Sequence, residues 1–174
     1  MLAALSPERR LELRLCSADE VQAQLLGGRV DVGVSYRPLL APGLESTVLA
    51  EEALALVGPP DSRPPPPEEV GALSFVTYEE FEYVFLQWFA HHGLPLPQQW
   101  RRGDHYEELE EVLAAVSQGR GWSIVPADAA RAPASGARLH CRPPSSPPCA
   151  NPVHLITRTG ELKSADARWL RTLF

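Results

Sequence analysis

Histidine and acidic side chains are the groups of this sequence that could act in catalysis or bind a metal ion. His91 and His92 are adjacent, and His105 follows Asp104. A helix presents metal ligands at positions i and i+4, so two adjacent histidines cannot both face one ion. We therefore interpret His91 and His92 as the solvated end of a helix, and we expect no metal site.

Other reactive residue types lack the patterns that catalysis needs. The sequence contains no GxSxG, HExxH or GxxxxGK[ST] motif, and GRG at 119–121 lacks the third glycine of a dinucleotide-binding loop. Six glutamates lie at the starts of predicted helices, where negative charge is favourable: Glu79, Glu80, Glu107, Glu108, Glu110 and Glu111. We interpret them as solvated helix faces, and we expect no enzymatic activity and no cofactor.

Composition narrows the class of protein further. The chain has 174 residues and a net charge of −6, from 16 basic and 22 acidic residues. This balance argues against broad neutralisation of DNA phosphates, which needs a basic face. No run of 18 apolar residues and no signal peptide is present, so we expect a cytoplasmic protein without a membrane segment.

The cysteines are few and lack metal-binding or disulfide spacing. Cys16, Cys141 and Cys149 form an odd set with no CxxC motif, and we expect free thiols. Cys16 could sense oxidants, although an unreactive buried or edge thiol is the simpler interpretation.

Two proline-rich segments divide the chain. They lie at 58–69 and 142–152 and hold many of the 18 prolines. Proline lacks a backbone donor and fixes φ, which excludes it from helix interiors and central strands. We predict connectors at 59–71 and 143–150, one lobe from 1–58 with 151–174, and a second lobe at 72–142.

Hydrophobic periodicity predicts alternating strands and helices. Leucines alternate with polar residues over 11–17, as in a half-buried strand, and Ser17 with Glu20 has the spacing of a capping box. Helices are predicted at 18–26, 79–93, 106–118, 127–133 and 164–174, and a charged turn at 101–105. Strands are predicted at 29–36, 47–51, 53–57, 73–78, 122–126, 137–141 and 153–159. The order indicates an α/β fold with βαβ units and largely parallel sheets.

Three ordered segments carry a family resemblance. They are LLGGRVDVGVSYRP at 25–38, GLESTVLAEEALALVGPP at 43–60 and EEVLAAVSQGRGWSIVP at 110–126. Their order and spacing resemble the effector-binding domain of LysR-type transcriptional regulators, across the whole chain. The resemblance implies two Rossmann-like lobes of the type 2 periplasmic-binding-protein kind.

The resemblance also implies an amino-terminal truncation. In the family, a winged helix-turn-helix, a first strand and most of a long helix precede the point that matches Met1. We therefore expect this chain to read DNA only through a domain that it lacks. The resemblance further implies an antiparallel homodimer.

Family members bind a small effector in the cleft between lobes, at strand ends and helix starts. Helix starts suit carboxylates because their N–H groups are free and carry partial positive charge. We therefore expect a small carboxylate or amino acid as the effector. The matching positions here are Ser17, Ser35, Thr77, Tyr78, His105, Val125 and Pro126. For Ser17 the alternative role is a helix cap alone, and for Thr77, Tyr78 and His105 a structural role.

Two other kinds of protein remain open at this stage. A standalone solute-binding or interaction module could use the same fold without binding DNA. An enzyme on a similar two-lobed scaffold is the third alternative, although no convergent acid and base residues support it.

Overall fold

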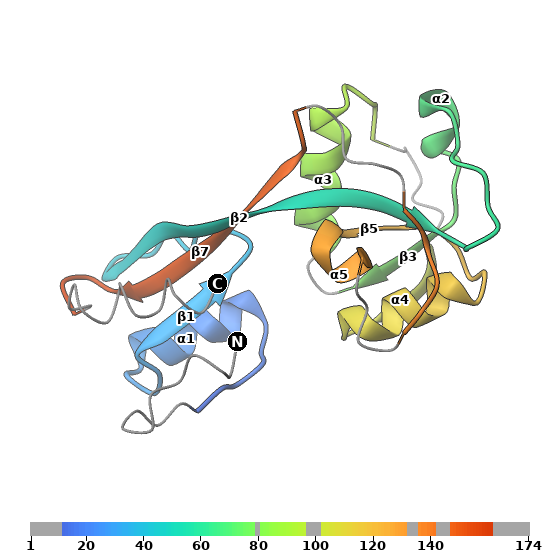
Figure 1. Ribbon diagram of the computed structural model, residues 1–174. Coiled ribbons are helices and arrows are strands. Elements are labelled where there is room, and N and C mark those ends of the chain that lie inside the picture. Colours follow the sequence, from blue (N-terminus) through green and yellow to red (C-terminus); the bar gives the residue numbers. More distant parts are fainter. Residues whose placement is uncertain (1–11, 79–80, 97–101, 132–135, 142–146, 162–174) are drawn as a thin grey trace. The chain divides into compact units, whose positions relative to one another are not determined.

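The computed structural model describes residues 12–78, 81–96, 102–131, 136–141 and 147–161. The chain forms two compact units, which are residues 1–51 with 152–174 (unit 1) and residues 52–151 (unit 2). Two strands pass from one unit to the other, β2 (Leu44–Gly58) and β7 (Ala150–Arg158), and both can be followed in Figure 1.

Unit 1 is a small sheet with helix α1 (Ala18–Leu26) on one face. Strand β1 (Val32–Ser35) pairs antiparallel with β7, and β7 lies next to β2 in the sheet. Leu25 of α1 and Ile156 of β7 are fully buried in the apolar cluster between helix and sheet. A Cβ at Gly33 would collide with the side chain of Val21, so the absence of a side chain lets α1 lie close to β1.

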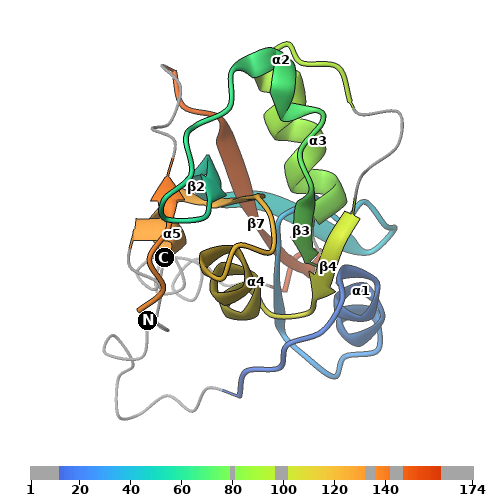
Figure 2. The ribbon, with the colours of Figure 1, turned by 90° about the vertical axis from the view of Figure 1, so that its right-hand side faces the viewer.

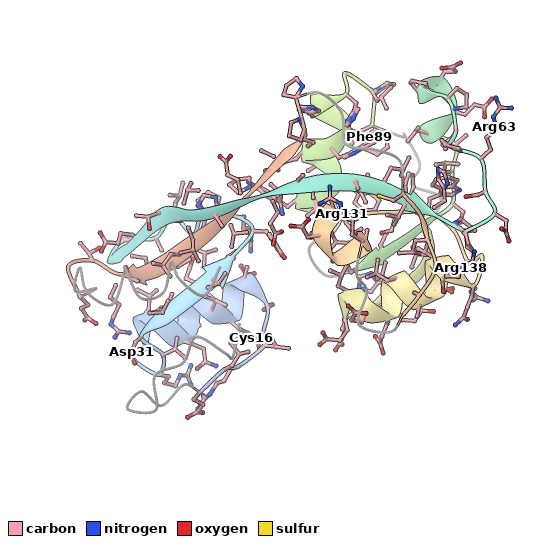
Figure 3. The ribbon with its side chains drawn as sticks, viewed as in Figure 1. Cys16, Asp31, Arg63, Phe89, Arg131 and Arg138 are labelled. Carbon is pink, nitrogen blue, oxygen red and sulfur yellow. The ribbon has the colours of Figure 1, made fainter. Side chains whose placement is uncertain are left out.

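Arg158 fastens the end of α1 to the sheet. Its Nη1 donates to the carbonyl oxygens of Leu25, at 2.8 Å, and Val30, at 2.7 Å. Its Nη2 lies 3.4 Å from the carboxylate of Asp31. In Figure 3, Asp31 and Cys16 lie at opposite ends of α1, so these contacts hold the carboxyl end of the helix. The carbonyl oxygen of Leu25 also accepts from the backbone N–H of Gly28, at 3.0 Å, so Arg158 adds a charged donor at this end of the helix.

Among the described residues, unit 2 contains most of the helices and the larger core. Strand β3 (Phe75–Tyr78) and strand β4 (Arg102–Tyr106) are parallel, and their arrows lie side by side in Figure 2. Strands β5 (Ser123–Pro126) and β6 (His140–Cys141) both pair antiparallel with β2. The helices are α2 (Pro67–Val70), α3 (Phe81–His91), α4 (Leu109–Ser117) and α5 (Ala127–Arg131).

Aromatic side chains organise the core of unit 2. The ring of Phe75 meets Phe85 and Phe89 of α3 edge to face, with centroids 5.2 and 6.2 Å apart. All three rings are fully buried. This packing anchors β3, and with it the adjacent candidate residues Thr77 and Tyr78.

The predicted strand at 11–17 is wrong over the described residues 12–17, which have no regular secondary structure. Leu13 and Leu15 are 63% and 77% exposed. Alternation of apolar and polar residues suits a strand, but a strand also needs a neighbour for its N–H and C=O groups. No described strand supplies that neighbour.

Several other elements also differ from their predicted bounds. The predicted strands 47–51 and 53–57 are parts of one continuous strand, β2. Most of the predicted turn at 101–105 belongs to β4, because the backbone of these residues pairs with β3. The connector 59–71 includes the short helix α2, where Pro67 occupies a first-turn position that needs no N–H. The predicted strand 137–141 is limited to His140 and Cys141. The predicted helix at 164–174 lies outside the described residues.

The α/β class is confirmed, but the expectation of largely parallel sheets is wrong for the described strands. β1 pairs antiparallel with β7, and β2 pairs antiparallel with β5 and β6. Parallel contacts join β3 to β4, and Phe75 to Trp122. A helix between two strands suggested a parallel βαβ unit for residues 11–36. That unit does not form, because residues 12–17 are not a strand and β1 pairs with a strand from the far end of the chain.

We predict that Arg158→Met lowers the free energy of unfolding by about 1.5–3 kcal/mol, because it leaves two carbonyl oxygens without their charged donor. Chemical denaturation of both proteins measures the difference. The matched control is Arg131→Met, which removes an exposed ion pair to Asp128 and should cost less than about 1 kcal/mol. Equal losses in the two variants would contradict the capping role of Arg158.

Candidate ligand-binding site

A row of polar side chains crosses the sheet of unit 1. Ser35 of β1 pairs with His154 of β7, and Oγ of Ser46 in β2 lies 3.3 Å from His154 Nδ1. Side chains two residues apart on a strand share one face, so Ser35 and His154 lie on the same face as Gly33 and Ile156, which α1 covers. On the sheet face that α1 covers, the pair Gly33–Ile156 is therefore apolar, and the next pair on that face, Ser35–His154, is polar.

The start of α1 lies at the same end of unit 1 as this polar row. Arg37, two residues beyond Ser35, donates to the carboxylate of Asp19 in the first turn of α1, at 2.7 Å. The backbone N–H of Arg37 also donates to Ser35 Oγ, at 3.2 Å. Ser17 forms the predicted capping box with Glu20. The structure thus brings Ser17 and Ser35 to one end of unit 1.

Burial controls the charge of His154. The side chain is 9% exposed, and this burial lowers its pKa below the ordinary value for histidine. The neutral imidazole is therefore favoured. When Nδ1 of the neutral ring accepts a hydrogen bond from the Ser46 hydroxyl, the ring's own hydrogen lies on Nε2.

The second group of predicted residues lies in unit 2. Thr77 Oγ1 is 2.9 Å from His105 Nδ1, across the paired strands β3 and β4. The Tyr78 hydroxyl donates to the carbonyl oxygen of Ile124 in β5, at 3.0 Å. Thr77 and Tyr78 are both buried. The carboxyl-terminal parts of β3 and β4 therefore meet at a hydroxyl–imidazole pair, and Tyr78 links β3 to β5.

Val125 and Pro126 belong to the frame of this second group. They pair with Ala55 and Leu54 of β2, and Val125 is fully buried in the core. Their side chains provide apolar packing, which suits the structural role better than a polar contact. Their predicted part in ligand binding, like that of the other five residues, stays a prediction.

An ion pair stabilises β4 next to His105. Arg120 Nε lies 2.6 Å from the carboxylate of Asp104, and the Tyr106 hydroxyl donates to the same carboxylate at 3.3 Å. The hydrogen bond from Arg120 is the main cause that lowers the pKa of Asp104. The Asp104 carboxylate therefore stays ionised and bonded to Arg120 and Tyr106, and its lowered pKa makes it a poor general base for His105.

Sequence reasoning missed three residues of unit 1: Arg37, Ser46 and His154. The signal for His154 was available, because a histidine stands two residues before Ile156 in an apolar strand and so shares its inward face. Arg37 follows a strand that was predicted correctly, and Ser46 could not be found without the pairing of β7 with β2.

His91 and His92 contact neighbouring groups, whereas Cys16, expected as a buried or edge thiol, is exposed and lies outside the described strands. The ring of His92 stacks on Trp88 with centroids 4.0 Å apart, and His91 Nε2 lies 3.1 Å from the carbonyl oxygen of Pro147. The three cysteines are free, and burial raises the pKa of Cys141 and Cys149. Raised thiol pKa values disfavour the reactive thiolate.

Within the described part of the chain, no group of three His, Cys, Asp or Glu side chains could hold a metal ion. None of the helices described there is long and apolar enough to cross a membrane.

Two α/β units connected through β2 and β7 define a domain of the type 2 periplasmic-binding-protein-like fold. The family model of the LysR substrate binding domain matches residues 1–174, which is the whole chain. The chain therefore belongs to the LysR substrate-binding-domain family. Comparison with curated protein sequences finds no match.

Solved structures of LysR-type regulators have the same fold. A full-length mutant of BenM is 20% identical with a TM-score of 0.76, and the match covers 96% of this chain and 58% of BenM. The cofactor-binding domain of the Cbl transcriptional regulator is 22% identical with a TM-score of 0.76, covering 97% and 76% of the two chains. The BenM effector-binding domain with its effector benzoate is 20% identical with a TM-score of 0.69, covering 94% and 78%. The chain thus spans little more than half of full-length BenM.

We predict that His154 makes stability depend on pH. Its folded pKa lies below the unfolded value of about 6.5, so the unfolded chain binds the proton more readily and stability falls as pH drops through that value. Denaturation at several values between about pH 5 and pH 8 should show a steeper loss for the wild type than for His154→Gln. Parallel curves for the two proteins would contradict this role of His154.

Proposed function

We propose that this chain is the small-molecule effector-sensing domain of a LysR-type transcriptional regulator. The family match over the entire chain is the observation that carries the proposal. The hydroxyl–imidazole pairs Ser46–His154 and Thr77–His105 support it, because they offer oriented hydrogen-bonding groups on an apolar frame.

We propose a small carboxylate or an amino acid as the effector. Unit 1 supplies the start of α1 and the Ser35 hydroxyl at one end of its sheet, and both groups favour an anion. Benzoate, the effector named for BenM, belongs to the same chemical class.

In the whole regulator, the effector changes the population of domain arrangements by binding one arrangement more tightly than another. DNA contact then comes through a separate amino-terminal domain, and the regulator is a homodimer. The net charge of −6 on the present chain supports this division of labour, since an acidic domain is poorly suited to hold DNA phosphates.

We predict that at least one compound in a panel of small carboxylates and amino acids raises the Tm of the chain. Ligand binding to the folded state stabilises it by RT ln(1 + [L]/Kd), so the rise should grow with ligand concentration. Differential scanning fluorimetry measures the effect, and isothermal titration calorimetry then gives the affinity. A panel without any concentration-dependent rise would overturn the effector-sensing proposal.

A matched pair of threonine variants localises the binding. Thr77→Val removes a buried hydroxyl while keeping the side-chain shape, and it should reduce the affinity for the stabilising compound by about tenfold, as expected for one lost hydrogen bond. Thr47→Val changes an exposed position of β2 and should leave the affinity unchanged. The same affinity in both variants would exclude Thr77 from the site.

A further inference from the structure

A run of consecutive prolines, residues 64–67, follows Arg63 between the end of β2 and the start of α2. Each of the residues 63–66 stands before a proline, and a residue in that position avoids the helical region of φ and ψ. The proline rings also fix φ at about −65°. Pro66 has φ −64° and ψ 155°, which is the polyproline II conformation. The local sequence therefore favours an extended left-handed helix at 63–66.

This polyproline II segment exposes two of its three ridges. The helix has about three residues per turn, so residues i and i+3 lie on the same ridge. Arg63 and Pro66 lie on one ridge and are exposed. Pro64 and Pro67 lie on the next ridge and are also exposed. Pro65, on the third ridge, is buried, so the segment turns one ridge toward unit 2 and leaves two ridges open to a partner.

Both ends of the segment are fixed to unit 2. Gly58, the last residue of β2, pairs with His140 of β6. The backbone N–H of Ser62 donates to the carbonyl oxygen of Pro59, at 3.0 Å. On the other side, Val70 of α2 is fully buried in the core. A segment that is already extended and held at both ends loses little conformational entropy when a partner binds it.

The segment also offers hydrogen-bond acceptors and charge. Among the described residues, none donates a backbone N–H to the carbonyl oxygens of Arg63 and Pro64. The exposed guanidinium of Arg63 stands at the start of the segment, and in Figure 3 it projects outward from the connector. Glu68 and Glu69 are exposed just beyond the prolines. The two ends of the proline run therefore carry opposite charges.

The chemistry of this surface favours a protein partner over a nucleic acid. Residues 58–71 contain one basic residue, Arg63, and three acidic ones, Asp61, Glu68 and Glu69. Such a stretch is poorly suited to phosphate groups. Rigid proline rings instead pack well on aromatic side chains, and protein domains with aromatic-lined grooves bind preformed polyproline II segments in this way.

We propose that residues 63–67 are a docking site for a protein domain whose aromatic-lined groove recognises polyproline II segments. The two exposed ridges fill the groove. Tryptophan or tyrosine side chains of the groove donate hydrogen bonds to the carbonyl oxygens of Arg63 and Pro64. An acidic side chain at one end of the groove pairs with Arg63. This docking site is independent of the proposed effector-sensing function and shares no residue with either polar group described above.

Nuclear magnetic resonance tests the proposal with the 174-residue chain as the ligand. Isotope-labelled SH3, WW and EVH1 domains serve as probes, because each binds polyproline II segments in an aromatic groove. The indole N–H resonance of the groove tryptophan reports on occupancy of the groove. We expect the chain to shift this resonance saturably in at least one of the three domains. No shift in any of the three would overturn the proposal.

Substitutions in the chain then localise the contact. The double variant Pro64→Ala with Pro67→Ala removes both prolines of one exposed ridge and should weaken binding by about tenfold, as expected for loss of a central contact. Arg63→Glu should also weaken binding, and its effect should shrink as salt is added. The matched control Pro42→Ala replaces an exposed proline of unit 1 and should leave the affinity unchanged.

The result that contradicts the assignment is equal affinity of the double variant and Pro42→Ala. The domain would then bind elsewhere, for example at the second proline-rich stretch, 142–152. Thermal denaturation checks that each variant is folded, and the wild-type titration stays decisive even where a variant folds poorly. Failure of this proposal leaves effector sensing untouched, because the two rest on different residues and different ligands.

Discussion

Backbone pairing along β2 is the constraint on which both units depend. Every peptide group in a sheet needs a hydrogen-bond partner, and β2 provides partners over 15 residues. Val57 pairs with Ser123 on one edge and with Cys141 on the other. Farther along the strand, β7 lies beside β2. The positions of β5 and β7, and hence of the polar residues on them, follow from this one strand.

The two candidate groups share one chemical arrangement. In unit 1 a hydroxyl of β2 faces Nδ1 of His154 on the adjacent β7, and in unit 2 Thr77 of β3 faces Nδ1 of His105 on the adjacent β4. Each contact fixes the orientation of the imidazole by a hydroxyl on the adjacent strand. Orientation by a rigid sheet lowers the entropy cost of binding a ligand, because the donor is already placed.

Local sequence signals predicted the helices well. The Ser17–Glu20 capping box is present, and α3 and α4 lie within the predicted helices, because caps and apolar stripes depend on residues a few positions apart. Strands were harder. Residues 12–17 alternate as a strand should and yet pair with no described strand, while most of the predicted charged turn 101–105 belongs to β4. In both places the deciding factor was a neighbouring strand, which no local pattern contains.

The sequence by itself determined the α/β class, the family, the capped start of α1 and five polar candidates at or near strand and helix ends. Tertiary structure alone decided that β1 runs antiparallel to β7 and that Ser35, Ser46 and His154 form one row. Ser46 and His154 are 108 residues apart in the chain. Contacts over that distance depend on which strands share backbone hydrogen bonds, and this choice minimises unpaired groups and exposed apolar area over the whole fold.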